Sequence, residues 1–250
     1  MIRAGDLLMI LLGAFILASL PALFLESTAV TGWILSGLLL MTPLIILQWK
    51  RRPDTRQLYP FCAPRNLSWR QLLLFGVSAL LTLDLVDFLI TQLLPPSTQL
   101  TGDIHELLLF GTPLRGMGVM LAVLVLAPLG EELLFRGFVY RYLLENRGVT
   151  EAVLISSLLF ALFHPGVYAL QILLFGFLLA LLRWRTASLL PPLLLHLLNN
   201  SWSLLDVNLP GVFPERGAAP WWIMVTVGTL LCCWLFYQFF VREDADEQVQ

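Results

Sequence analysis

The chain has 250 residues, of which 58% are hydrophobic and 13% are charged, and its mean hydropathy is +0.81. A water-soluble domain of this size needs far more polar cover, so the composition excludes an ordinary soluble fold and predicts a membrane protein. The formal net charge of −2 says nothing about nucleic acid or acidic partners, and the basic residues are clustered.

Apolar stretches long enough to cross a hydrocarbon core, about 20 residues each, recur along the whole chain. The first resembles a signal sequence, but it lacks an A-x-A cleavage pattern and is interpreted as a retained helix. The fold class is therefore all-α, a polytopic transmembrane helical bundle in one transmembrane domain, residues 1–250. Eight spans are predicted between Pro, Gly and charged breakers: 6–25, 30–49, 70–94, 116–144, 150–166, 167–182, 187–204 and 221–241.

The fourth span is unusual, because its apolar run continues past Pro128 into the segment EELLFRGFVYRYLL. Two interpretations are open for it. It is either one long tilted helix or a span joined to an amphipathic helix.

The distribution of Lys and Arg predicts the orientation. With the N-terminus inside, the eight spans place thirteen of the 15 basic residues on the inner side and only Arg115 and Arg216 on the outer side. One missed or added helix would invert every later loop and remove this bias, and basic loops favour the cytoplasmic side. Both termini are therefore predicted to be cytoplasmic. The small size and compact loops predict a bacterial inner-membrane protein.

The fourth span contains three charged residues within six positions, Glu131, Glu132 and Arg136. A single charge near the bilayer centre already costs about 2.5–3.5 kcal/mol. Glu132 and Arg136 are i and i+4 on one helix face, so they are expected to form an ion pair. Glu131 is rotated about 100° away and has to find a proton, a cation, a histidine or water elsewhere, which suits a general base. The alternative is that both acids form a solvated turn in the cytoplasmic headgroup region.

Two histidines occupy later spans. His164 precedes a Pro-Gly turn, and Phe160 lies one turn before it on the same face; alone, such a histidine is equally an interfacial or capping residue. His196 lies among leucines, with Asn199 at i+3 and Asn200 at i+4, so one helix face combines an imidazole and a carboxamide. Its alternative role is a hydrogen bond to a neighbouring span.

Three helices each carry one polar patch, which favours a single shared site. A carboxylate can deprotonate water, an imidazole can relay that proton, and a His-Asn pair can donate hydrogen bonds to an oxyanion, so the set suits hydrolysis. The same side chains could instead hold a divalent metal such as zinc, with Glu131, His164 and His196 as ligands. No H-E-x-x-H signature supports a conventional zinc site, and spacing alone leaves both mechanisms open.

The remaining polar residues are weaker candidates. Asp84 and Asp87 in the third span either support the site from behind or lie near the outer interface. Asp103, His105 and Glu106 lie in an expected outward loop and are interpreted as solvated rather than metal-binding. The three cysteines are expected to be reduced thiols and not a disulfide framework: Cys62, Cys232 and Cys233.

At these residues the sequence resembles the CPBP family of intramembrane endopeptidases, which includes CAAX-processing proteases of the Ras-converting type and bacteriocin-processing or immunity homologues. The resemblance covers roughly residues 116–204, which form the predicted catalytic core, and it rests on three motifs in order. The family's E-E-x-x-x-R, F-x-x-x-H and H-x-x-x-N patterns correspond to Glu131-Glu132-Leu-Leu-Phe-Arg136, Phe160-Ala-Leu-Phe-His164 and His196-Leu-Leu-Asn199-Asn200.

The resemblance implies that Glu131 and His164 activate the attacking water, and that His196 and Asn200 stabilise the oxyanion. Glu132 with Arg136 would maintain the site. The predicted function is hydrolysis of a peptide bond in a membrane-associated peptide or protein. The predicted partners are the lipid bilayer and a membrane-associated substrate, with no nucleic acid. A metal-free mechanism is favoured, because His196 and Asn200 look more like paired donors than like a ligand and its neighbour. The alternative function is a non-catalytic immunity factor or transporter-like protein that uses the same charges.

Overall fold

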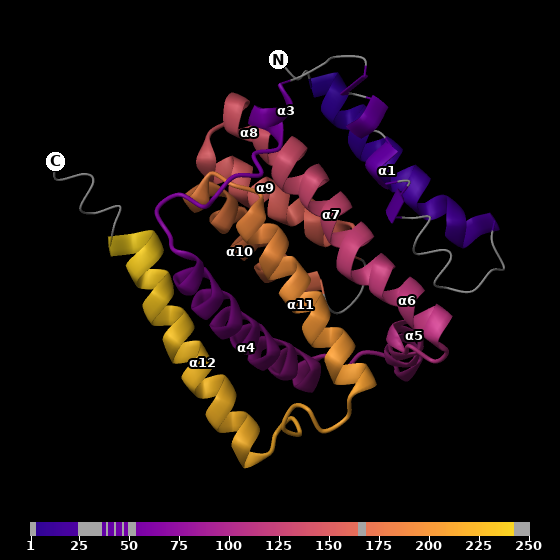
Figure 1. The fold of residues 1–250 in the computed structure, drawn as a ribbon, viewed down its shortest axis with the longest axis vertical. Coiled ribbons are helices and arrows are strands. Elements are labelled where there is room, and N and C mark those ends of the chain that lie inside the picture. Colours follow the sequence, from indigo (N-terminus) through magenta and orange to yellow (C-terminus); the bar gives the residue numbers. More distant parts are fainter. Residues whose placement is uncertain are drawn as a thin grey trace.

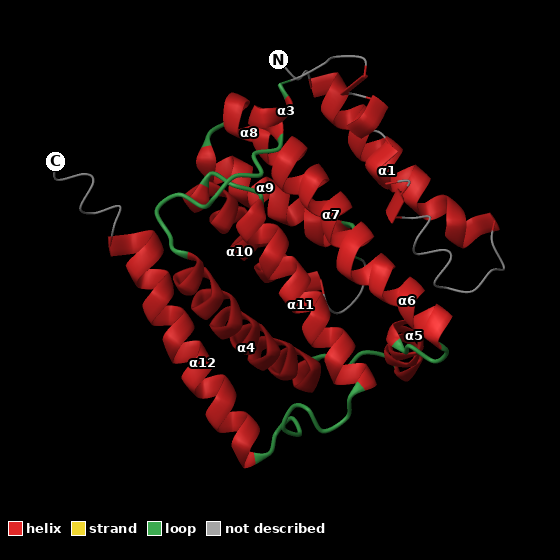
Figure 2. Cartoon of the chain, in the orientation of Figure 1, coloured by secondary structure: helices red, strands yellow, loops and turns green. Residues whose placement is uncertain are grey.

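The structure is a computed structural model, and it describes residues 4–24, 37–38, 40–42, 44–46, 48–49, 54–164 and 169–242. Throughout this part of the chain the regular elements are helices, joined by short loops (Figures 1 and 2). In chain order they are α1 (Ala4–Phe24), α3 (Thr55–Leu58), α4 (Trp69–Leu93), α5 (Thr98–Leu108), α6 (Pro113–Met120), η1 (Leu121–Leu126), α7 (Ala127–Glu131), η2 (Glu132–Val139), α8 (Tyr140–Asn146), α9 (Val149–Leu162), α10 (Ala169–Thr186), α11 (Leu190–Asn208), α12 (Ala219–Tyr237) and η3 (Gln238–Arg242).

Local sequence signals account for several helix starts. Ser68 and Gln71 form a capping box at the start of α4, in which each side chain accepts a hydrogen bond from the other residue's backbone N–H. Thr112 caps α6, and Pro113 occupies its first turn, where a missing N–H costs no hydrogen bond. The same use of proline recurs at the first turns of α11 and α12.

The predicted fourth span is one continuous helical rod, from Pro113 to Asn146. It contains two π-helical segments, η1 and η2, in which the backbone hydrogen bonds reach five residues back. Pro128 is the second residue after η1 and has no backbone N–H to donate. Such π-segments are frequent at functional sites, and both of these flank Glu131.

The helix α11 lies in the middle of the bundle (Figure 1) and contacts α10, α4, α5, α7 and η1. On either side of it, α9 packs along α10 and α12 packs along α4. The main apolar core joins these helices to the rod through fully buried side chains such as Phe75, Phe135, Phe138 and Leu179. Because the rod and α11 are held on several sides, polar residues on their facing surfaces have fixed positions.

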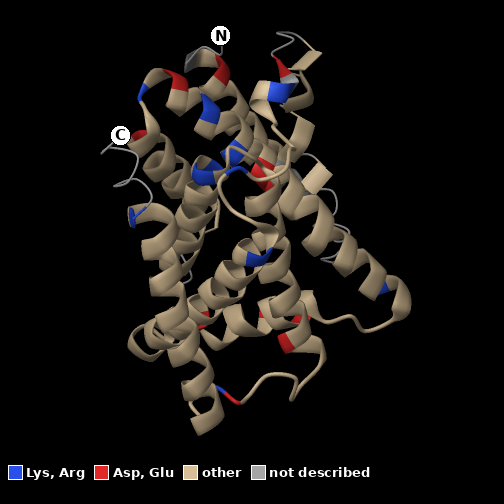
Figure 3. Ribbon diagram, turned by 60° about the vertical axis from the view of Figure 1, so that its left-hand side comes forward, with Lys and Arg blue, Asp and Glu red and all other residues tan. Residues whose placement is uncertain are grey.

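Three helices in the described part of the chain are long and apolar enough to cross a membrane: Trp69–Leu93, Pro113–Asn146 and Ala219–Arg242. Gly5–Leu17 and Val149–Leu162 are shorter apolar helices. The chain is thus a helical integral membrane protein, while the count of eight spans stays a prediction. Figures 1 and 3 show that α1 begins and α12 ends toward the same end of the bundle, where Lys and Arg also gather. The cytoplasmic location of this end stays a prediction.

Two expected boundaries differ from the structure. The segment 95–115, expected to be an outward loop, contains the amphipathic helix α5, which Ser97 caps by accepting a hydrogen bond from Leu100. The expected span 150–166 is shorter, since α9 ends at Leu162. Half of the predicted span 30–49 lies outside the described residues.

Candidate active site

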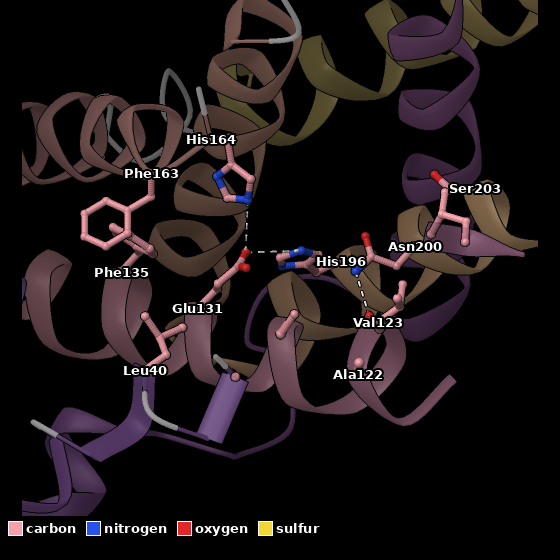
Figure 4. A pocket seen from close by; sticks show the side chains of 13 residues that line it. Leu40, Ala122, Val123, Glu131, Phe135, Phe163, His164, His196, Asn200 and Ser203 are labelled. Atoms are coloured by element: carbon pink, nitrogen blue, oxygen red, sulfur yellow. Dashed lines mark hydrogen bonds and ion pairs between the residues drawn. The ribbon is translucent and has the colours of Figure 1, made fainter. Parts of the chain in front are cut away.

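A cavity of about 450 Å³ opens between the rod, the end of α9 and α11 (Figure 4). Four of its lining side chains are those expected to react, and the structure therefore brings together residues from three separate helical segments: Glu131, His164, His196 and Asn200. The rest of the wall is largely apolar: Gly37, Leu40, Leu108, Ala122, Val123, Ala127, Phe135, Phe163 and Ser203.

Glu131 points one carboxylate oxygen at both histidines (Figure 4). Its Oε2 lies 3.8 Å from His164 Nε2 and 3.7 Å from His196 Nε2. This oxygen is buried and has no hydrogen-bond partner. His164 reaches it because α9 ends early, so the histidine lies in the turn just beyond the helix. The solvated-turn interpretation of Glu131 does not hold, since its side chain is only 15% exposed.

Glu132 faces a different direction and binds two partners with one oxygen. Its Oε1 accepts a hydrogen bond from Arg136 Nη1 at 3.2 Å, which is the ion pair expected from the i, i+4 spacing. The same oxygen lies 2.9 Å from His196 Nδ1. This second contact joins helices 64 residues apart in sequence, and the spacing within either motif gave no signal for it. Glu132 and Arg136 are 1% and 0% exposed, so the pair is fully enclosed.

The Phe160 ring contacts three of these polar side chains. The Arg136 guanidinium lies 4.3 Å from the centre of its ring, and the rings of His164 and His196 lie 4.8 and 5.9 Å from it. Arg136 also donates a hydrogen bond to the Gly176 carbonyl at 3.0 Å. A Cβ at Gly176 would lie 3.0 Å from Phe160 and 3.3 Å from Arg136, so α10 approaches this closely because the residue is glycine.

Asn200 is held by a backbone carbonyl that the helix itself leaves free. Its Nδ2 donates to the Val123 carbonyl at 2.8 Å. In η1 the Ala127 N–H bonds to the Ala122 carbonyl, and the next residue, Pro128, has no N–H. The Val123 carbonyl therefore lacks a helical donor. In the sequence, the one signal for this free carbonyl was Pro128, a proline within an apolar run.

Asn199 supports Asn200 from the side and does not line the cavity. Its Nδ2 donates to Asn200 Oδ1 at 3.2 Å, which fixes the amide of Asn200 with its nitrogen toward Val123. Ser203, which was not predicted, lines the cavity, and its hydroxyl donates to the Asn199 carbonyl at 3.3 Å. The two adjacent asparagines thus have different positions, one in the wall and one behind it.

The other acidic candidates lie elsewhere. Asp84 and Asp87 are buried and bind Arg216 at 2.5 and 3.0 Å, and Asp84 also accepts a hydrogen bond from Trp221 at 2.7 Å. They join α4 to the loop before α12 and to α12 itself, and they do not line the cavity with Glu131. The remaining three, Asp103, His105 and Glu106, are exposed on α5.

The two histidines and Glu131 share one feature with zinc sites. Both histidines engage Nδ1 elsewhere and turn Nε2 toward one carboxylate, an arrangement that also occurs around zinc. Tetrahedral zinc with bonds of about 2.0–2.1 Å would hold its ligand atoms roughly 3.3 Å apart, which is closer than the 3.7 and 3.8 Å separations here. Within the described ranges, no three His, Cys, Asp or Glu side chains form a group that could hold a metal ion.

Comparison with known proteins agrees with the motifs. No curated protein and no solved structure matches the chain. A family model does match: residues 113–202 correspond to the family described as type II CAAX prenyl endopeptidase, Rce1-like. This segment runs from the start of the helix Pro113–Asn146 into α11, and it contains Glu131, His164, His196 and Asn200. Residues 113–202 are thus similar to the Rce1-like family, which is a family of proteases.

Proposed function

We propose that the chain is an intramembrane endopeptidase that hydrolyses a peptide bond with a water molecule activated by Glu131 and His164. The family is a protease family, which supports hydrolysis of a peptide or protein substrate. The observation that carries the proposal is Glu131 Oε2, a buried acceptor without a hydrogen-bond partner, facing two imidazole nitrogens across a cavity.

The hydrogen bonds at the two histidines determine where protons are available. His164 Nδ1 lies 2.9 Å from the Phe160 carbonyl, which can only accept, so Nδ1 carries the proton. Its Nε2 is then an acceptor in the neutral ring. His196 Nδ1 likewise donates to the Glu132 carboxylate. Glu131 Oε2 and His164 Nε2 are therefore two acceptors 3.8 Å apart, and a water molecule placed between them can donate a hydrogen bond to each.

The attack follows from this geometry. The water oxygen bonds to the carbonyl carbon of the substrate while Glu131 accepts a proton from that water. The carbonyl oxygen becomes an oxyanion. Asn200 Nδ2 has two hydrogens and gives one to Val123, so the other is available to the oxyanion. When the C–N bond breaks, the proton held by Glu131 passes to the leaving amine, with His164 as the relay.

Charge balance supports a second donor at His196. Glu131 and Glu132 carry two negative charges and Arg136 carries one positive charge in a largely enclosed layer. Burial of an uncompensated charge is costly, and one proton on His196 Nε2 balances the layer. That N–H faces the cavity beside Asn200 (Figure 4), where both can bind the oxyanion.

The cavity wall indicates the substrate class. Most of its lining residues are apolar or aromatic, and the reactive groups occupy one side. An extended peptide segment with apolar side chains fits such a wall better than a peptide segment with charged side chains does. We propose a membrane-associated peptide or a membrane-protein segment as the substrate, cleaved within the bilayer.

Replacement of Glu131 tests the proposal most directly. E131Q keeps the shape of the side chain but cannot accept the proton, so peptide cleavage by the purified, folded protein is expected to fall by about 10²–10⁴-fold. E145Q is the matched control, because Glu145 is an exposed glutamate of the same rod that pairs only with Arg141. Full activity in E131Q would refute the assignment. Loss of a protective phenotype without any cleaved product in the wild type would instead support the non-catalytic alternative.

We also propose that this reaction uses no metal. Cleavage is then expected to be unchanged after treatment with a chelator, and elemental analysis of the active protein should find metal far below one equivalent. Stoichiometric zinc together with inhibition by the chelator would overturn the metal-free mechanism and leave the choice of residues intact.

A further inference from the structure

A buried arginine outside the active site has no acidic partner among the residues that the structure describes. Arg183, in the last turn of α10, is 5% exposed. Among the described residues, its guanidinium makes no hydrogen bond or ion pair, and it lies 5.5 Å from the centre of the Tyr140 ring in a cation–π contact. Its Nε is enclosed and without a hydrogen bond. A guanidinium carries five N–H donors and a permanent charge, so most of its binding capacity is unused.

Within the described part of the chain, the ionisable neighbours of Arg183 include an arginine and no carboxylate. The ionisable groups that influence it electrostatically are Tyr140, Arg141 and Cys62, and none of them is a carboxylate. Arg141 is itself occupied by Glu145 at 2.7 Å. Arg185, in the same turn as Arg183, is 8% exposed. A buried cation normally has a partner because an unpaired one is costly.

The described segments around Arg183 are rich in arginine. The segment 59–67 crosses this end: the Leu189 N–H donates to the Pro60 carbonyl at 2.9 Å, and Ser188 donates to the Cys62 carbonyl at 2.6 Å. The segments that meet here, 54–70, 140–151 and 183–189, contain seven arginines and three acids. The arginines are Arg56, Arg65, Arg70, Arg141, Arg147, Arg183 and Arg185, and the acids are Asp54, Glu145 and Glu151.

We propose that Arg183 is the centre of a binding site for the phosphodiester of an anionic phospholipid in the inner leaflet. The planar fork of a guanidinium matches two phosphate oxygens. Its place at the end of α10, between apolar helix and basic loops, is the level at which lipid headgroups lie under the orientation predicted above. This site is separate from the Glu131 cavity and does not depend on the proposed reaction.

Thermal unfolding of the delipidated, detergent-purified full-length chain tests the proposal. The probes are short-chain phosphatidylglycerol, short-chain phosphatidylcholine and inorganic phosphate at equal concentrations. Phosphatidylglycerol is expected to raise the unfolding midpoint by several degrees, because a ligand that binds only the folded state stabilises it. R183Q should lose most of this rise. R147Q, which removes an exposed arginine from the same end, should keep it.

Each alternative outcome overturns the proposal. An equal rise in R183Q shows that Arg183 is not the binding residue and serves only the contact with Tyr140. An equal rise with phosphatidylcholine shows that charge is not recognised, and an equal rise with inorganic phosphate assigns the site to a free anion instead of a lipid. If R183Q does not fold, R183K keeps the charge without the fork. It should retain less than half of the rise, and an unchanged rise contradicts the proposal.

Discussion

Two pairs of acidic residues lie within apolar helices of this protein, and their environments differ in one respect. In the first pair, Asp84 uses both carboxylate oxygens, one for Arg216 and one for Trp221, and Asp87 also binds Arg216. In the second pair, Glu132 binds Arg136 and His196, but Glu131 makes no hydrogen bond with any described residue. Only Glu131 faces a cavity together with two histidines.

The comparison shows how an acid in a membrane helix can be assigned a role. Carboxylates joined to a cation and an indole tie helices together, as Asp84 ties α4 to α12. Burial lowers the pKa of the Arg216 guanidinium, but Asp84 and Asp87 together raise it above its ordinary value, so this cation stays charged. A carboxylate with an open acceptor next to a cavity is instead available for proton transfer. The position of an acid within an apolar helix does not by itself distinguish a structural carboxylate such as Asp84 from one available for proton transfer such as Glu131.

Removal of the cation from each cluster should have different consequences, and the larger is expected at Arg136. R136M leaves Glu132 buried without its cation and is expected to cost about 3–5 kcal/mol of unfolding free energy, with loss of cleavage. R216Q should cost about 1–2 kcal/mol and leave cleavage unchanged, because the Arg216 side chain is 44% exposed and water can replace it. Unfolding midpoints and initial cleavage rates of both variants measure this difference.

A loss of cleavage in folded R216Q would break the distinction between the clusters, since it would connect the Asp84 cluster to catalysis. If R136M keeps wild-type stability, the Glu132–Arg136 pair has no structural role. Both variants remove one cation, so the comparison controls for the change in net charge.

The sequence predicts the helical class and most helix positions here because apolar length is a property of each segment alone. The start of α4 at Trp69, one residue before the expected boundary, follows from its own capping box. The helix α5 is harder to predict, because it is short and its mean hydropathy is low for a span. The π-segments are not predictable from periodicity, since η1 is accompanied by the hydrogen bond between Val123 and Asn200, which lies 77 residues later.

In the candidate site too, features within one helix could be predicted from the sequence, and contacts between helices could not. The motifs identify four residues that line the cavity, Glu131, His164, His196 and Asn200. The i, i+4 spacing predicts the Glu132–Arg136 pair. The contacts between helices could not be predicted from the sequence: Glu132 with His196, Arg136 with the Gly176 carbonyl, and Phe160 beneath both histidines. These contacts depend on how helices pack, and a motif specifies only spacing along one helix.

Pro128 allows the smallest and most specific test of how the site is positioned. P128A supplies a backbone N–H at position 128. This N–H can donate to the Val123 carbonyl five residues earlier, which is the π-helical pattern of η1. That N–H competes with Asn200 for the carbonyl, so the Asn200 amide should become less ordered. Because alanine is also the better helix former, the unfolding midpoint should stay equal or rise while kcat falls by roughly threefold to tenfold. This loss is smaller than the about 10²–10³-fold expected when an oxyanion donor is deleted in N200A.

Steady-state kinetics and thermal unfolding of P128A, measured side by side, separate positioning from folding. KM should change little, because the cavity wall keeps its apolar side chains. A fall in kcat that accompanies a lower unfolding midpoint would mean that Pro128 shapes the rod as a whole. An unchanged kcat would show that the hydrogen bond from Asn200 to Val123 does not matter for the reaction. A lower kcat in a protein of equal or greater stability would connect one missing N–H in the rod to the oxyanion donor on α11.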